Sequence, residues 1–325
     1  MQFMTAYQNM FLSLEDSHVS NWSPSMNTQA NWRSIAIVLA AVFLFACQDA
    51  IGKYLFASYP VPFVQAVRYF VNVAIMLALF LPRLGWGIAR TSRIWLVSAR
   101  GVALAFGSLT GGLALRTMPL AEMNSILYLA PLGVLFLSMP VLGEKVKWFG
   151  WVATGIGFVG LLFIVRPGTN LSGISLIYAF LCLLTAVVYP MLSRLLSKTE
   201  STQTLMFYVG LAGSIFFGAQ LPWSLPAHLP ALPDMGLMVA LGAISLVGHS
   251  LFTAAYARAP VSLLAPFTYA HIAWATLLGW LVFQQVPDRI TFIGIGLVAI
   301  AGVGNAAMNH FSSRKPDLVT EPQEF

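Results

Sequence analysis

Ten apolar runs, each close to the length of a bilayer-spanning helix, constrain the fold of this chain more than any other sequence feature. A bilayer core about 30 Å thick needs roughly 20 apolar residues per helix, and Pro, Gly or charged residues interrupt the sequence at about that spacing. Only 9% of the residues are charged, against about a quarter in soluble domains. The sequence therefore predicts an all-α integral membrane protein with ten transmembrane helices, over about residues 34–59, 62–82, 94–115, 119–142, 148–165, 173–196, 204–221, 234–257, 261–283 and 290–308.

The positive charges indicate how the chain is threaded through the membrane. Of the 17 Lys and Arg residues, eleven fall in the termini and loops on one side, three in loops on the other, and Lys53, Arg68 and Arg100 within spans. Because cytoplasmic loops carry the excess of Lys and Arg, this split predicts that both termini are cytoplasmic. We expect Arg100, six residues from the inner end of its span, to reach the interface. The basic residues form no patch, which argues against a nucleic-acid partner.

The two halves of the chain resemble each other when the sequence is shifted by 141 positions without a gap. The residues that coincide lie at equivalent depths in the third, fourth and fifth spans of each half: Gly101 and Gly242, Gly107 and Gly248, Pro119 and Pro260, Tyr128 and Tyr269, Leu137 and Leu278, and Gly155 and Gly296. Since five spans is an odd number, the second half enters the membrane from the opposite side. The chain is thus predicted to form two inverted five-helix repeats, an architecture typical of secondary transporters, which bind substrate near the midplane.

Polar tails flank the two predicted repeats. Residues 1–32 form a polar N-terminal tail, 33–165 the first repeat, 173–308 the second repeat and 309–325 a polar C-terminal tail. The first tail has no apolar core of the kind expected in a cleavable signal peptide, and the sequence does not predict whether Met1 or Met26 is the start. The only cysteines, Cys47 and Cys182, lie in apolar runs, so neither a disulfide nor a metal site is predicted.

Ionisable residues within the spans are the first candidates for function. Each costs about 2.5–3.5 kcal/mol at a helix centre and needs a partner or a water-filled cavity. At 1.5 Å per residue, Asp49 lies roughly 15 Å from the outer end of its span, and Lys53, Arg68 and Glu122 lie about 9, 9 and 5 Å from theirs. Asp49 and Lys53 are four residues apart and share a helix face, and Arg68 enters at a depth from which it can reach Asp49 or Glu122.

Two interpretations of this cluster remain open. Asp49 either pairs with Lys53 or Arg68 and holds the first two helices together, or it lines an outer vestibule in which Asp49 or Glu122 binds a substrate cation or exchanges a proton. At a shift of 141 positions Asp49 coincides with a proline, and Arg68 and Glu122 coincide with apolar residues. The charges are therefore not part of the shared scaffold, which favours the vestibule.

Aromatic residues and a histidine follow one face of the ninth span. Phe267, His271 and Trp274 are spaced i, i+4 and i+7 and form a stripe on an α-helix. The stripe is either a packed helix interface or a stacking wall for a flat heteroaromatic ligand. Tyr269 lies nearby but is not placed on the stripe.

The fourth span adds Asn124 and Tyr128, spaced i, i+4, which can hydrogen-bond to substrate or to a neighbouring helix. The candidate substrate-binding or coupling residues are therefore Asp49, Lys53, Arg68, Glu122, Asn124, Tyr128, Phe267, Tyr269, His271 and Trp274. No catalytic residue, metal ligand or cofactor is predicted, because the chain lacks HExxH, GxSxG and aspartate-rich motifs.

Several stretches resemble the drug/metabolite transporter superfamily, EamA type, over about residues 34–308. They are DAIGKYL (49–55), RTMPLAEMNSILYLAPLGVLFLSMPVLGEKV (116–146), GWVATGIGFVGLLFIVRPG (150–168), ARAPVSLLAPFTYAHIAWATLLGWLVF (257–283) and PDRITFIGIGLVAIAGV (287–303). The second half departs from the family pattern, with Gln284-Gln285 where the first half has Gly143-Glu144.

The resemblance implies a multi-pass carrier of the bacterial inner membrane that moves a small organic molecule through a central cavity. DAIGKYL and APFTYAHIAWAT resemble the subgroup of S-adenosylmethionine and riboflavin uptake proteins. We expect uptake of such a compound, with membrane lipids as neighbours and a proton as the candidate coupling ion. Export of amino-acid-derived metabolites or metallophores is the alternative, and a non-transporting scaffold or lipid-translocating accessory subunit is an alternative of another class. The sequence does not predict an oligomeric state.

Overall fold

Helices account for the regular secondary structure of the residues that the structure describes, and no strand occurs among them. The computed structural model describes residues 28–117, 123, 126–127, 129–143, 148–165, 173–284 and 289–312. The long helices are α2 (Thr28–Ser58), α3 (Val61–Leu84), α4 (Ile94–Thr117), α6 (Ala130–Leu142), α7 (Trp148–Val165), α8 (Gly173–Leu196), α9 (Thr202–Gly218), α11 (Leu232–Arg258), α13 (Ala270–Phe283) and α14 (Arg289–Ser312). Short helices η2 (Gly85–Ala89), α10 (Leu221–Ser224), α12 (Val261–Leu264) and η3 (Ala265–Tyr269) complete the described part.

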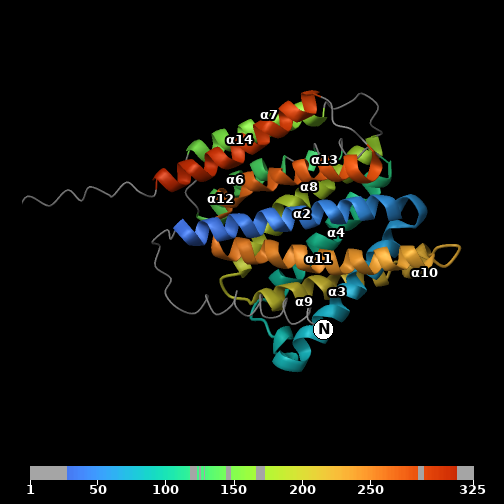
Figure 1. Ribbon diagram of the computed structural model, residues 1–325. Coiled ribbons are helices and arrows are strands. Elements are labelled where there is room, and N and C mark those ends of the chain that lie inside the picture. Colours follow the sequence, from blue (N-terminus) through green and yellow to red (C-terminus); the bar gives the residue numbers. More distant parts are fainter. Residues whose placement is uncertain are drawn as a thin grey trace, which may run out of the picture.

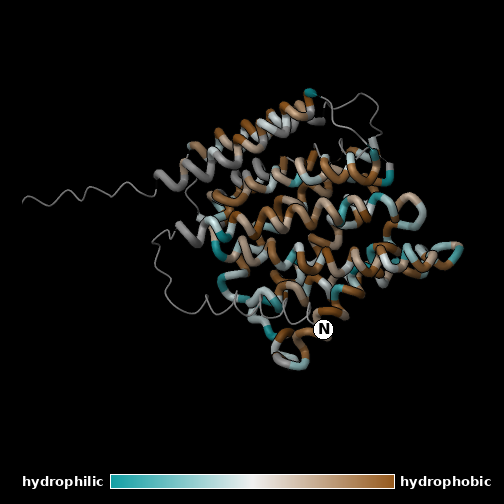
Figure 2. The backbone as a smooth tube through the Cα atoms, viewed as in Figure 1, coloured by the Kyte–Doolittle hydropathy of each residue, from teal (hydrophilic) through white to brown (hydrophobic). Residues whose placement is uncertain are grey.

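These helices confirm the predicted fold class of an all-α membrane protein. Five of them, α2, α3, α4, α8 and α11, contain membrane-length apolar stretches, and shorter apolar helices occur at Trp148–Gly160, Phe267–Phe283 and Phe292–Ala301. Helices α7 and α8 begin and end at the predicted residues. Figure 2 shows that brown, apolar residues run along most of the helices, with teal residues mainly toward their ends.

The ninth predicted span is not one continuous helix, and this part of the prediction is wrong. It consists of α12, the 3-10 segment η3 and then α13. Pro266 lies at the start of η3. Proline has no N–H to donate and its ring clashes with the carbonyl four residues earlier, so the α-helical ladder breaks there. The spacing of side chains on either side of the break therefore departs from the helical period.

Helices pack in pairs that the repeat relates to one another. Helix α2 packs on α11 as its counterpart α8 packs on α4, α3 packs on α11 as α9 packs on α4, and α13 packs on α2 as α6 packs on α8. The equivalent helices α7 and α14 pack on each other and lie together at one edge of the bundle (Figure 1). This arrangement is that of two halves related by a pseudo-twofold axis.

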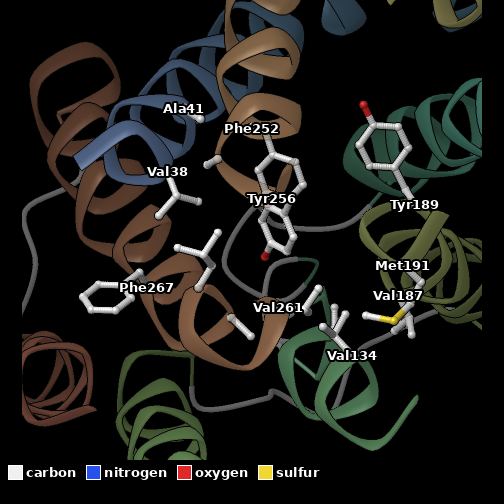
Figure 3. Close-up of a cluster of buried hydrophobic side chains, with 14 of the residues drawn as sticks. Val38, Ala41, Val134, Val187, Tyr189, Met191, Phe252, Tyr256, Val261 and Phe267 are labelled. Carbon is white, nitrogen blue, oxygen red and sulfur yellow. The ribbon is translucent and has the colours of Figure 1, made fainter. Parts of the chain in front are cut away.

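A buried apolar cluster joins the two halves. Its members come from α2, α3, α4, α6, α8, α9, α11, α12 and η3, and Figure 3 shows part of it around Phe252 and Tyr256. Trp95 and Trp223, each 85% exposed, belong instead to a set of large apolar side chains on the outside of the bundle. An apolar exterior of this kind fits contact with lipid.

Equivalent helix ends of the two halves share an unusual backbone conformation. Gly143 follows α6 with a φ of 66°, and Gln284, 141 positions later, follows α13 with a φ of 56°. Gln284 is the only residue other than glycine with a positive φ in the described part of the chain. The second half thus uses a side chain that disfavours this conformation where the first half uses glycine.

Candidate substrate-binding site

A cavity of about 310 Å³ lies between the two halves of the bundle. Its lining residues come from α2, α3, α4, α6, α8, α11, η3 and α13, together with Met123 and Leu127. Small-molecule sites commonly occupy about 300–1,000 Å³ and combine apolar walls with a few polar groups. The cavity is therefore the candidate substrate-binding site.

The repeat relates many of the residues that line this cavity. We call two residues 141 positions apart repeat partners. Eight such pairs line the cavity with both members: Phe45 and Ala186, Gln48 and Tyr189, Asp49 and Pro190, Ser108 and His249, Gly111 and Phe252, Leu115 and Tyr256, Leu127 and Thr268, and Ala130 and His271. The cavity therefore lies on the pseudo-twofold axis, while its ionisable residues each occur in one half only.

Asp49 and His271 meet across the interface of the two halves. The Nε2 atom of His271, in the first turn of α13, lies 3.2 Å from Oδ2 of Asp49 on α2. The His271 side chain is 14% exposed, the Asp49 side chain is 26% exposed, and both line the cavity. Asp49 thus lines a cavity and also contacts a second helix through His271, a partner that neither of the two open interpretations assigned.

Lys53 does not line the cavity, unlike Asp49 one turn earlier on α2. Its Nζ lies 5.4 Å from the centre of the Phe283 ring at the end of α13, and the residue is absent from the cavity lining. A cation over an aromatic face is stabilised by the ring quadrupole. The pairing of Asp49 with Lys53 or Arg68, one of the two open interpretations, is not found among the described residues, where Asp49 contacts His271.

Arg68 lies on the α3 side of the cavity and is only 3% exposed. Its Nη2 donates a hydrogen bond of 2.8 Å to Oγ of Ser108 on α4, and its guanidinium carbon lies 4.5 Å from the centre of the Tyr69 ring. The hydroxyl groups of Tyr69 and Ser108 are 3.0 Å apart. Gln65, one turn before Arg68, donates to the carbonyl oxygen of Ser108 at 3.1 Å. These contacts anchor a cation beside the cavity.

Aromatic rings cover the α8 and α11 sides of the cavity. Phe252 and Tyr256 follow each other along α11 (Figure 3), with ring centres 4.4 Å apart. Phe45 lies 4.7 Å from the His249 ring and 5.6 Å from the Phe252 ring, and Tyr189 lies 6.2 Å from Phe252. All five residues line the cavity.

The stripe predicted on the ninth span does not form the cavity wall. Of its members only His271 lines the cavity. Phe267 belongs to the buried apolar cluster, and the Trp274 ring makes an edge contact with Phe43, with centres 5.0 Å apart. Tyr269 is fully buried, and its ring packs where a Cβ on Gly157 of α7 would lie. Because Phe267 lies in the 3-10 segment before α13, it does not share the helix face that carries His271.

Arg100 is buried and does not reach the interface as expected. It is 0% exposed and donates four hydrogen bonds: to Oγ of Ser193 at 2.9 Å, the carbonyl oxygen of Leu205 at 3.1 Å, the hydroxyl of Tyr189 at 2.8 Å and Oγ1 of Thr253 at 2.7 Å. These bonds join α4 to α8, α9 and α11. We call them the Arg100 network.

Sequence reasoning missed Gln65, Ser108 and the aromatic residues of α8 and α11. One signal was present: Ser108 and His249 are repeat partners, and each follows a glycine of a repeated pair. Glu122, Asn124 and Tyr128 lie outside the described residues. Within the described part of the chain, no group of three His, Cys, Asp or Glu side chains is placed to hold a metal ion.

Two inverted helical repeats around a cavity of aromatic and ionisable side chains define a membrane transporter. The chain belongs to the EamA-like transporter family, whose sequence pattern matches residues 32–166 and again residues 173–305. The family identifies the chain as a multi-pass membrane transporter and not an enzyme.

Curated relatives cover most of the chain at low identity. An S-adenosylmethionine uptake transporter of Rickettsia bellii (strain RML369-C) is 25% identical over 84% of this chain and 94% of its own length. The pseudopaline exporter of Pseudomonas aeruginosa (strain UCBPP-PA14) is 27% identical over 82% and 93%. A riboflavin transporter of Rhizobium johnstonii is 24% identical over 86% and 92%. A solved crystal structure aligns with a TM-score of 0.72 at 21% identity, over 87% of this chain and 98% of the other, and shares the fold.

Proposed function

We propose that this transporter takes up a nitrogenous, partly aromatic metabolite, of the kind represented by S-adenosylmethionine or riboflavin, across the bacterial inner membrane. Both termini are cytoplasmic in this proposal, because Lys and Arg are concentrated on their side of the membrane. The observation that carries it is the pairing of an acid with aromatic walls in one cavity: Asp49 with its histidine partner, beside Phe45, Phe252 and Tyr256.

The chemistry of the cavity suits a cationic ligand with a flat ring. A carboxylate in a cavity of low dielectric attracts a positive group such as a sulfonium or ammonium. The aromatic rings offer faces and edges for offset stacking with a heterocycle. S-adenosylmethionine has both features, whereas riboflavin has only the flat ring.

The contact of Asp49 with His271 also supports a proton as the coupling ion. The two residues lie on helices of opposite halves, so their contact changes when one half rocks against the other. Arg68, Cys182 and His249 share the cavity with the pair, and Lys53 lies one turn further along α2. In this mechanism a proton and the substrate cation bind in turn at Asp49 and His271.

Export of an amino-acid-derived metallophore is a second candidate. It is favoured by the 27% identity with the pseudopaline exporter, which is aligned over 93% of its length. The same cavity serves either direction, because alternating access is reversible and the gradients of substrate and coupling ion determine net flow.

Transport by the purified chain in proteoliposomes tests the proposal. Uptake of labelled S-adenosylmethionine and riboflavin is measured with and without an imposed pH gradient, in the wild type and in Asp49→Asn. The control is Asp234→Asn, since Asp234 binds the Tyr59 hydroxyl outside the cavity. We expect uptake that responds to the gradient and is lost in Asp49→Asn alone. Equal accumulation in liposomes with and without the protein contradicts the proposal.

Metabolite levels in bacteria determine the direction. S-adenosylmethionine, riboflavin and amino-acid-derived metallophores are quantified by mass spectrometry in cells and medium, with the protein absent or overproduced. Uptake predicts accumulation inside the cells and depletion of the medium. Accumulation in the medium on overproduction instead supports the exporter.

A further inference from the structure

We propose that Arg68, Ser108 and Gln65 form a subsite for a carboxylate, and, on the basis of the proposed transport function, that this carboxylate belongs to the substrate. The three side chains lie together on α3 and α4 at the cavity, with Arg68 bonded to the Ser108 hydroxyl and Gln65 to the Ser108 carbonyl. None of them forms part of the contact between Asp49 and His271.

The first argument is a buried charge that no carboxylate among the described residues compensates. Arg68 is 97% buried, yet no carboxylate within the described ranges forms an ion pair with it. Its Nε, a donor, has no hydrogen-bond partner. A buried cation that only neutral groups contact keeps much of its desolvation cost. An anion entering the cavity would supply the missing charge and accept the free N–H.

The second argument is that neighbouring groups hold the guanidinium in place. Ser108 donates its own proton to the carbonyl oxygen of Leu104 at 2.7 Å, which leaves its Oγ lone pairs for Arg68 and Tyr69. The Tyr69 ring supports the guanidinium from the side, at 4.5 Å. The cation therefore needs little reorganisation when a ligand arrives.

The third argument concerns the kind of anion. A guanidinium presents its N–H groups in a planar fork that matches the two oxygens of a carboxylate, and such bidentate bonds are stronger than neutral ones. The repeat partners of Gln65 and Arg68 are Met206 and Val209, and neither lines the cavity. The subsite is thus specific to one half, as expected for ligand recognition.

A carboxylate at Arg68 and a cation at Asp49 together describe an amino acid or a compound that carries one. This substrate class includes S-adenosylmethionine and excludes a neutral flavin. S-adenosylmethionine is therefore the proposed uptake substrate that fits this subsite, and riboflavin is the one that does not.

Matched probes that differ only in the carboxylate test this subsite. The melting temperature of the purified protein in lipid nanodiscs is measured in the presence of acetate and of acetamide. In a second measurement, the affinity for S-adenosylmethionine is compared with that for its decarboxylated form. In the wild type, we expect acetate alone to raise the melting temperature and the carboxylate form to bind roughly ten- to a hundredfold more tightly. Arg68→Gln should lose both preferences. Arg68→Lys should keep part of them, because it retains the charge without the fork.

Two controls separate this subsite from folding and from transport. Arg116→Gln removes an exposed arginine at the end of α4 and should keep both preferences. If Arg68→Gln does not fold, Ser108→Ala and Arg68→Lys carry the test. Equal effects of acetate and acetamide, or an unchanged preference in Arg68→Gln, overturn the subsite even if S-adenosylmethionine is transported. An acetate effect that depends on Arg68 supports the subsite even if S-adenosylmethionine is not the substrate.

A separate observation leads to a second proposal: we infer that the Arg100 network is a latch that closes one end of the cavity. Three members of the network, Arg100, Ser193 and Thr253, have as repeat partners Leu241, Gly52 and Gly112. All three partners line the cavity, and none of the three network members does. Equivalent positions are thus bonded together on one side of the pseudo-twofold axis and line the cavity on the other side.

This asymmetry describes one state of an alternating-access cycle. In an inverted repeat the two ends of the cavity open in turn, as each half adopts the conformation of the other. To open the Arg100 end, α4 must separate from α8, α9 and α11 and break the four bonds of the network. Tyr189 belongs to the network and also lines the cavity, so a ligand that displaces its hydroxyl weakens the latch.

Hydrogen exchange distinguishes a latch from a structural brace. Deuterium uptake is measured by mass spectrometry for residues 193–205, at the Arg100 end, and for residues 52–64, at the opposite end, in nanodiscs. For a latch, Arg100→Met should raise uptake at the first segment and lower it at the second. The equilibrium between the state closed at the Arg100 end and the state open there should shift roughly threefold for each interhelical hydrogen bond removed. Ser193→Ala with Thr253→Val is the milder variant. Increased uptake at both segments, or no change at either, overturns the latch.

Discussion

Gly213→Ala tests how the packing of α9 supports the carboxylate subsite. A Cβ added at Gly213 would overlap three atoms of the Tyr69 ring. That ring is 1% exposed, is stacked on Phe217 with centres 5.4 Å apart, and has its hydroxyl 3.0 Å from that of Ser108. It cannot move without losing one of these contacts, so the added methyl group forces a displacement.

The size of the effect follows from two opposing terms. Overpacking a core costs about 1–3 kcal/mol, and three overlapping ring atoms place this site near the upper end of that range. Replacing glycine by alanine inside a helix returns about 1 kcal/mol. We therefore expect Gly213→Ala to reduce the free energy of unfolding by about 2 kcal/mol. Displacement of Tyr69 also frees Ser108, so binding at Arg68 should weaken.

Thermal melting in nanodiscs, with and without acetate, measures both consequences. Gly155→Ala is the matched control, because a Cβ at this position of α7 meets no atom within 4 Å. The control should be neutral or more stable by up to about 1 kcal/mol and should keep the acetate effect. The reasoning is refuted if Gly213→Ala melts like Gly155→Ala, or if it melts lower but keeps the full acetate effect.

Three further predictions concern other parts of the chain. Asp49→Asn should lower transport per folded molecule, measured as uptake divided by monodisperse protein; unchanged uptake would make the contact with His271 purely structural. Gln284→Gly should raise the free energy of unfolding by about 0.5–1 kcal/mol, because glycine relieves the positive φ; chemical denaturation measures this, and a loss of stability would contradict it. The hydrogen bond of 2.7 Å that Tyr59 donates to Asp234 raises the pKa of the Tyr59 hydroxyl. The stabilisation of the wild type relative to Tyr59→Phe should therefore be present below about pH 10 and be lost as the pH rises through the raised pKa. A difference in melting temperature between the two proteins that stays constant with pH would refute this.

Much of the fold was predictable because bilayer thickness sets the length of each span. The predicted limits of α7 and α8 match the structure, and most of the others differ by a few residues. The ninth span was wrong at Pro266, where a proline that a membrane helix can tolerate broke this one. Hydropathy does not distinguish the two cases, because neighbouring helices determine whether the freed carbonyls find partners.

The candidate site was predictable only in part, for a different reason. Helical spacing shows which residues share a face, but not which neighbouring helix that face meets. Asp49, Arg68 and His271 do line the cavity, whereas Lys53 faces Phe283. Arg100 was expected at the interface because its depth is compatible with snorkelling, and its four acceptors come from three helices distant in sequence.

The eight pairs of repeat partners around the cavity have a consequence for how a molecule is held there. A frame with twofold symmetry offers the same shape to either end of its guest and would accept it in two opposite orientations. Asp49, with proline as its repeat partner, and His271, with alanine, remove that equivalence. A substrate with unlike ends therefore has one preferred orientation along the membrane normal, whereas a symmetrical substrate would have none.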